Sequence, residues 1–123
     1  MSEQKQTMAI VASHGHENER SMVAWTIASG AQNADMDVTM FLVASAVDIV
    51  RKGAIEHARP NPCDPPLKDI VHGFLGRGGK ILCCPPCAKV RGYEQEDLID
   101  GVEVIGSAAL HALIKDGAHT LCF

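Results

Sequence analysis

Short, almost continuously hydrophobic runs alternate along this chain with longer segments in which apolar residues are spaced more widely. Runs of this kind are typical of strands that are buried on both faces of a sheet. They predict strands over residues 8–12, 37–43, 80–83, 102–105 and 120–123. Because strands buried on both faces occur mainly in parallel sheets, the pattern indicates the α/β class.

The segments between the predicted strands have helical periodicity. Over residues 20–32, Val23, Ile27 and Ala31 recur on one helix face, and either Asn18 or Ser21 can cap the start. The same criteria predict a short helix at 46–52, a longer one at 67–75, a helical turn at 88–91 and a last helix at 107–115.

Strands and helices therefore alternate, which predicts a mostly parallel five-stranded sheet covered by helices on both faces. We expect one domain over residues 1–123, with residues 1–6 flexible. Segment 54–66 contains four of the six prolines and one cysteine, Cys63, and is predicted to be an irregular loop because proline cannot donate a backbone hydrogen bond.

The composition narrows the possible partners and the compartment. The chain of 123 residues has a formal net charge of −4, so it has no basic surplus for binding nucleic acid or anionic lipid. Its richest apolar run, 40–50, is too short to span a bilayer. Five cysteines, an odd number, without a secretory signal favour a reducing compartment. We therefore expect a cytoplasmic protein that binds neither nucleic acid nor membrane.

Successive parallel strands end at one edge of the sheet, and ligands of such sheets bind beyond the carboxyl ends of the strands. The predicted elements place five residues with polar or thiol side chains at this edge: Ser13, His14, Ser45, Cys84 and Ser107. This edge is the expected position of a functional site.

The run Cys83-Cys84-Pro85-Pro86-Cys87 contains C-x-x-C spacing directly after a predicted strand. If a helical turn begins at Pro85 or Pro86, Cys84 lies near its start, and the Cys87 amide is the first donor that can face the Cys84 sulfur. The residue before a proline avoids helical angles, which opposes a start at Pro85. The pattern leaves open which cysteine is capped and which is the primary thiol.

Nearby charges are expected to tune these thiols. Lys89 and Arg91 follow in the same turn, and positive charge favours a thiolate over a thiol. His14 is predicted to share the edge with Cys84 and is a further candidate for tuning. The alternative interpretation is purely structural: the cysteines are inert buried thiols, since cysteine is one of the most frequently buried residues.

Metal and cofactor sites are not indicated. Cys63, Cys84, Cys87 and a histidine lack the second closely spaced ligand pair of a zinc site, and His14 and His16 alone are too few. No cofactor motif is present, so we expect neither a metal nor a cofactor. Cys122, in the last predicted strand, is expected to be a small core residue.

The segment 82–92, with the pattern C-x-x-C-x-x-x-R-G, and the segment 98–104 resemble the DsrE/DsrF-like sulfur-relay family and its YchN-like branch. The resemblance implies a three-layer α/β/α sandwich, assembly into trimers or hexamers, and a cysteine that accepts sulfur as a persulfide and passes it on. It places the sulfur-carrying cysteine at Cys84, and Cys87 matches a second cysteine found in part of the family. The proline-rich loop with Cys63 departs from the family pattern.

The predicted function is that of a sulfur carrier or sulfurtransferase component with a protein sulfur donor and a protein acceptor. Cys84 forms the persulfide, and Cys87 is a resolving or second thiol. Two other functions remain open from the sequence. One is a thiol-disulfide oxidoreductase that uses Cys84 and Cys87, and the other is a non-catalytic oligomeric binding module.

Overall fold

The computed structural model describes residues 5–123. Most of the segment expected to be flexible, residues 1–4, lies outside the described residues. Its last two residues are held to the body of the protein. The Lys5 ammonium lies 3.2 Å from a carboxylate oxygen of Asp35, and the Gln6 carbonyl accepts the Asp37 N–H at 2.9 Å.

Five parallel strands form one sheet, as the hydrophobic runs predict. The strands are β1 (Thr7–Ala12), β2 (Asp37–Leu42), β3 (Lys80–Cys83), β4 (Val102–Val104) and β5 (His119–Cys122). Their order across the sheet is β4-β3-β2-β1-β5, and every neighbouring pair is parallel. The first four strands are added in one direction, and the chain then crosses back to place β5 beside β1.

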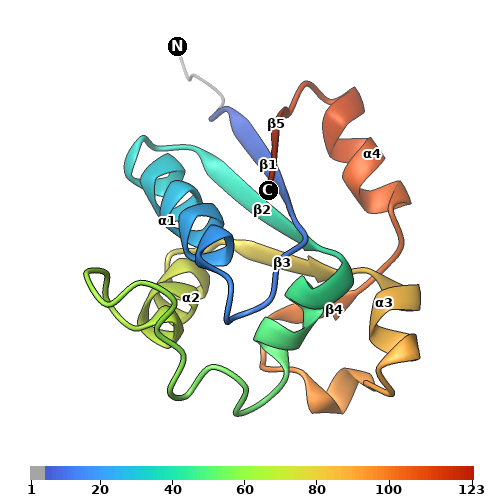
Figure 1. The fold of residues 1–123 in the computed structure, drawn as a ribbon. Helices are drawn as coiled ribbons and strands as arrows, with labels where there is room; N and C mark the ends of the chain where they lie inside the picture. The colour runs from blue at the N-terminus through green and yellow to red at the C-terminus, as the bar shows by residue number, and fades with distance from the viewer. Residues whose placement is uncertain (1–4) are drawn as a thin grey trace.

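Helices cover both faces of this sheet, which confirms the predicted α/β/α sandwich. The helices are α1 (Glu19–Asn33), α2 (Leu67–Gly76), α3 (Pro85–Val90) and α4 (Ala108–Lys115), with 3₁₀ helices η1 (Ala44–Val50) and η2 (Gln95–Asp97). Helices α1 and α2 pack side by side on one face and α4 lies on the other (Figure 1). No helix within residues 5–123 has both the length and the hydrophobicity needed to cross a bilayer.

Local chemistry accounts for the start of α1. Of the two predicted caps, Asn18 is the N-cap, because its side-chain oxygen accepts the Arg20 N–H at 2.9 Å. Ser21 lies inside the first turn, where its hydroxyl donates to the Asn18 carbonyl at 2.7 Å. The prediction of a helix after β1 is therefore confirmed, but the buried face of the helix runs through Ala24, Trp25 and Ala28, and Val23 is 42% exposed.

The helix predicted at 46–52 is wrong in type and limits. The segment forms η1, a 3₁₀ helix that begins at Ala44 and ends at Val50, before Lys52. Three of its residues, Val47, Ile49 and Val50, are β-branched and fully buried. Branched side chains disfavour a short α-helix, and tighter 3₁₀ turns are common in short connecting segments. The segment 54–66 that follows lacks regular helix or strand in the structure, as predicted.

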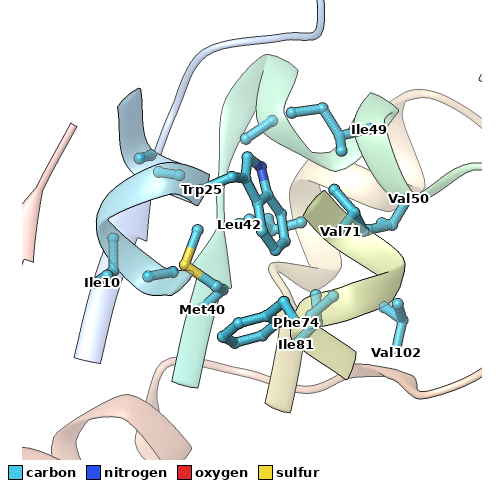
Figure 2. Close-up of a cluster of buried hydrophobic side chains, with 14 of the residues drawn as sticks. Ile10, Trp25, Met40, Leu42, Ile49, Val50, Val71, Phe74, Ile81 and Val102 are labelled. Atoms are coloured by element: carbon cyan, nitrogen blue, oxygen red, sulfur yellow. The ribbon is translucent and has the colours of Figure 1, made fainter. Parts of the chain in front are cut away.

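The core lies mainly between the sheet and the α1–α2 layer (Figure 2). Trp25 of α1 and Phe74 of α2 are fully buried there and meet edge to face, with ring centroids 5.5 Å apart. The opposite face of the sheet is also covered, since Ala9, Phe41 and Leu82 are buried. The central strands are therefore buried on both faces, which explains their continuous hydrophobic sequences.

Candidate functional site at the carboxyl edge of the sheet

The carboxyl ends of neighbouring strands bring the predicted edge residues into one region. The Val43 N–H donates to the Ala12 carbonyl at 3.0 Å, and the Cys84 N–H donates to the Leu42 carbonyl at 3.0 Å. These bonds continue the sheet pairing by one residue beyond β2 and β3. The segments that leave β2 and β3, namely η1 and α3, therefore begin next to each other.

Helix α3 begins at Pro85, with prolines at its first two positions, where the missing N–H groups cost no helical hydrogen bond. Cys84 is the N-cap residue and has an extended backbone, with φ −63° and ψ 123°. This conformation satisfies the restriction that Pro85 places on the preceding residue. The structure thus decides a point that the sequence left open: Cys84, and not Cys87, occupies the cap position.

The cap position stabilises a Cys84 thiolate only in part. Burial raises the pKa of the half-buried Cys84 thiol, and the Cys87 side chain raises it further by hydrogen bonding and by charge. The Cys87 amide opposes this shift, but it faces the sulfur without full hydrogen-bond geometry. The net pKa shift of Cys84 is upward, against the expectation from the helix start alone. The same interactions indicate that the two thiols lie close together.

Cys87 has a backbone donor of its own. The Ala44 N–H, at the start of η1, donates to the Cys87 sulfur with a nitrogen–sulfur distance of 3.2 Å. Ala44 has φ +50°, a left-handed conformation that residues other than glycine adopt rarely. A sparsely populated backbone conformation thus aims a donor at a cysteine sulfur, and such conformations cluster at functional sites.

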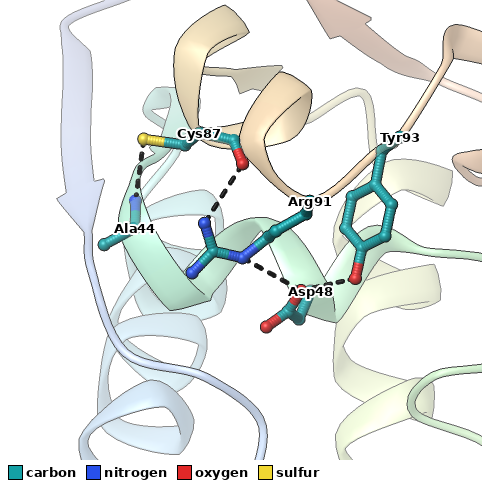
Figure 3. A network of polar contacts seen from close by, with 5 residues as sticks. All are labelled: Ala44, Asp48, Cys87, Arg91 and Tyr93. Atoms are coloured by element: carbon teal, nitrogen blue, oxygen red, sulfur yellow. Dashed lines mark hydrogen bonds and ion pairs between the residues drawn. The ribbon is translucent and has the colours of Figure 1, made fainter.

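Arg91, Asp48 and Tyr93 form a polar network next to Cys87 (Figure 3). The Arg91 guanidinium donates from Nη1 to the Cys87 carbonyl at 3.1 Å, and its Nε lies 3.3 Å from Oδ1 of Asp48. The Tyr93 hydroxyl donates to the same Asp48 oxygen at 2.5 Å. Burial raises the pKa of Tyr93, and Asp48 raises it further, so the phenol remains a donor at neutral pH.

Sequence reasoning identified Arg91 in this network but missed three other participants. Asp48 looks like a solvated or capping charge in the sequence, whereas in the structure it accepts from both Arg91 and Tyr93. Ala44 acts through its backbone, which no side-chain pattern reveals. The four-residue spacing of Cys87 and Arg91 is the sequence signal that places Arg91 beside Cys87, since residues four apart in a helical turn share a face.

Two residues predicted to tune the thiols, Lys89 and His14, form no described hydrogen bond to either sulfur. Lys89 is exposed and lines an open hollow of about 480 Å³ beside α3, together with Pro85, Tyr93 and Gln95. His14 is at the predicted edge, but its Nδ1 lies 2.8 Å from the Phe123 carbonyl, and no described hydrogen bond joins it to either thiol.

The remaining cysteines have separate environments. Cys83 ends β3 inside the core, where burial raises its pKa from 9.0 to about 12, so it stays a neutral thiol. Cys63 is exposed on the 54–66 loop. The expectation that Cys122 is a core residue is wrong, because β5 is an edge strand and Cys122 is exposed. Within residues 5–123, no three histidine, cysteine or acidic side chains are grouped as metal ligands.

Solved structures share this fold. The ychN protein from E. coli superposes with a TM-score of 0.78 at 19% sequence identity, covering 98% of this chain and 100% of that protein. A protein of unknown function from Methanobacterium thermoautotrophicum, MTH1491, gives a TM-score of 0.69 at 16% identity over 98% of this chain and 100% of its own. At these identities the likeness concerns the fold.

Sequence relatives cover most of the chain. The uncharacterized protein MK0008 of Methanopyrus kandleri is 28% identical over 106 residues, which is 86% of this chain and 81% of the relative. The uncharacterized protein MJ0989 of Methanocaldococcus jannaschii is 26% identical over 115 residues, which is 93% of this chain and 96% of the relative. The profile of the DsrE/DsrF-like family matches residues 5–123, nearly the entire length. By this match the chain belongs to the DsrE/DsrF-like family.

Proposed function

We propose that this protein is a sulfur carrier that accepts sulfur as a persulfide on Cys84 and passes it to a protein partner. The family is associated with sulfur relay. The observation that carries the proposal is the pair of free thiols, Cys84 and Cys87, that lie close enough to influence each other at the carboxyl edge of the sheet. Ligands of parallel sheets bind at this edge, and both thiols are half-buried and so remain reachable from solvent.

The proposed reaction is a pair of thiol exchanges. The Cys84 thiolate attacks the outer sulfur of a donor persulfide, a new sulfur–sulfur bond forms, and the donor leaves as a thiolate. An acceptor thiolate then attacks the outer sulfur of the Cys84 persulfide, and Cys84 leaves as a thiolate. Sulfur moves without net oxidation, so the reaction needs no redox cofactor.

The raised pKa of Cys84 suits a carrier. A thiol of higher pKa is less ionised at neutral pH, but its thiolate is intrinsically more nucleophilic, which offsets part of the loss. The same property makes Cys84 a poorer leaving group, so transfer of the outer sulfur from Cys84 is slow unless the acceptor is a strong nucleophile. We expect the loading rate to rise as pH increases toward the pKa of Cys84.

The surroundings of α3 support a macromolecular donor and acceptor. Pro86, Lys89 and Val90 are exposed next to the thiols, and 79% of Val90 is accessible. The open hollow beside α3 provides space for a partner side chain, and Lys89 provides positive charge on its wall. Apolar and cationic groups beside a reactive thiol fit a transient protein contact.

Intact-mass spectrometry after incubation with a low-molecular-weight persulfide tests the proposal. We expect wild type to gain about 32 Da, the mass of one sulfur, and Cys84→Ser to gain none. Cys63→Ser is the matched control, because it removes an exposed thiol elsewhere on the surface and should load like wild type. Undiminished loading of Cys84→Ser would reject the assignment of Cys84 as the carrier.

The contact between the thiols also favours a second candidate, a thiol-disulfide oxidoreductase that uses Cys84 and Cys87. Turnover of a disulfide substrate that requires both cysteines, without sulfur loading, would support it. A binding module without thiol chemistry predicts neither activity, and its thiols would alkylate only after unfolding.

A further inference from the structure

Two contacts join η1 to α3, and each involves a residue near one of the thiols. At one end of η1, the Ala44 N–H donates to the Cys87 sulfur at 3.2 Å. Further along, Asp48 pairs with Arg91 at 3.3 Å, and Arg91 in turn donates to the Cys87 carbonyl. Cys87 is thus held through both its side chain and its backbone (Figure 3).

The spacing of these contacts along the two elements differs by only roughly 2 Å, a difference that side chains can span. Ala44 and Asp48 are four residues apart on a 3₁₀ helix, a separation of roughly 8 Å along its axis. Cys87 and Arg91 are four residues apart at the end of an α-helix, roughly 6 Å along its axis. The two pairs of partners can therefore meet together, so the Asp48–Arg91 contact keeps the Cys87 sulfur at the Ala44 amide.

Cys84 accepts no described hydrogen bond that corresponds to the one from the Ala44 N–H to the Cys87 sulfur. The Cys84 sulfur lacks a capping hydrogen bond, and burial raises the pKa of Cys84 although the Cys87 amide opposes part of this shift. Other charged or titratable groups near this segment are the neutral Cys83 thiol on β3, Arg91 at the C-cap of α3 and Asp48 on η1. A backbone amide stabilises negative charge on the sulfur that it contacts, so the environment distinguishes the two thiols.

We propose that Cys87 is the resolving thiolate of the pair and that Asp48 is the residue that positions it, through Arg91, against the Ala44 amide. This inference rests on the proposed sulfur loading of Cys84. The Cys84 persulfide then has two fates: transfer of its sulfur to an acceptor, or release of the sulfur as sulfide when no acceptor is bound.

The resolving step balances without an external oxidant. The Cys87 thiolate attacks the inner sulfur of the Cys84 persulfide, a Cys84–Cys87 disulfide forms, and the bond to the outer sulfur breaks. The outer sulfur leaves with the bonding electrons as hydrosulfide. The two cysteines are oxidised by two electrons and the transferred sulfur is reduced by two. A dithiol reductant is then needed to restore the pair.

The role of Asp48 can be tested on the reduced protein, independently of sulfur loading. The measurement is the rate of alkylation of each cysteine by iodoacetamide at neutral pH, assigned by peptide fragmentation in a mass spectrometer. In wild type we expect Cys87 to react faster than Cys84. In Asp48→Asn we expect the Cys87 rate to fall about fivefold, the factor that corresponds to one ordinary hydrogen bond.

The direction of the change in the Cys87 alkylation rate shows whether Asp48 acts by positioning Cys87 or only through its negative charge. Removing a nearby negative charge would by itself favour the thiolate and speed the reaction, whereas loss of positioning slows it. Asp48→Glu should restore most of the rate, and Asp116→Asn, an exposed carboxylate beyond α4, should react like wild type. Tyr93→Phe, which removes one donor to Asp48, gives a second and milder variant if Asp48→Asn does not fold.

Sulfide release tests the resolving step itself. Wild type loaded with sulfur and freed of donor should lose about 34 Da as hydrogen sulfide and form the disulfide, whereas loaded Cys87→Ser should keep its sulfur. Loading without release in wild type, or an unchanged or faster Cys87 rate in Asp48→Asn, would overturn the inference and leave the carrier function standing. Failure to load would instead reject the carrier function, and the resolving step with it.

Discussion

Cys83, Cys84 and Cys87 lie within one short segment, yet each sulfur has a different environment. Cys83 is enclosed in the core, Cys84 is half-buried at a helix cap, and Cys87 is half-buried against a backbone amide. Three residues of one type thus acquire different chemistry from their surroundings alone. The sequence identified the segment, but it could not rank the thiols, because the ranking depends on burial and on a donor from another segment.

The raised pKa of Cys83 predicts that the protein loses stability at high pH. Its pKa is raised from 9.0 to about 12 by burial first and then by the neighbouring cysteines, so the folded state holds the proton longer than the unfolded state. The stabilising contribution is therefore complete below about pH 9 and is lost as pH rises toward 12. A shift of this size corresponds to at most about 4 kcal/mol.

Urea unfolding at a series of alkaline pH values measures this effect. The free energy of unfolding of wild type should fall between pH 9 and 12, and that of Cys83→Ala should fall less. Cys83→Ala should also be less stable at neutral pH by about 1–2 kcal/mol, because it leaves a small cavity. Parallel curves for the two proteins would show that Cys83 does not cause the alkaline loss.

At the scale of elements, the strands could be predicted because their hydrophobic runs are continuous, and the three longer helices because their apolar residues recur at helical spacing. The predicted strand limits agree within one residue of those observed. The type of η1 could not be predicted, since its four buried residues, Ala46, Val47, Ile49 and Val50, follow one another too closely to define one helix face. The docking of η1 on α3 joins residues more than forty positions apart, and no local pattern reports it.

Close packing between α2 and β3 gives a prediction at this scale. A Cβ atom added at Gly79 would lie 2.4 Å from the ring of Phe74, which packs against Trp25 in the core. Gly79→Ala should therefore lower the free energy of unfolding by about 2–3 kcal/mol. Gly76→Ala, where nothing lies within 4 Å, is the matched control and should be neutral or slightly stabilising in thermal unfolding.

At the scale of the whole molecule, β5 leaves one edge of the sheet open. All four of its residues are exposed, and Leu121 of β5 and Ile114 of α4 are 39% and 42% accessible. An uncovered edge strand with apolar side chains favours pairing with another chain. We propose that copies of this chain assemble through the β5 edge into a trimer or hexamer.

Sedimentation equilibrium should then give a mass of three or six chains of 13.2 kDa. Leu121→Lys should shift the population to smaller species, because it places a charge in the proposed contact. Glu103→Lys, at the opposite edge on β4, should leave the mass unchanged. A monomeric wild type, or dissociation by Glu103→Lys alone, would argue against this interface.

The contact between Ala44 and Cys87 has a consequence for how this protein tolerates mutation. The donor is a backbone N–H, which every residue except proline supplies, although the left-handed backbone at position 44 disfavours β-branched and bulky side chains. A mutational scan would assign importance to Asp48 and Arg91 and pass over Ala44. The amide that donates to the Cys87 sulfur thus survives any substitution that tolerates the left-handed backbone, while its alignment depends on side chains that a single base change can replace.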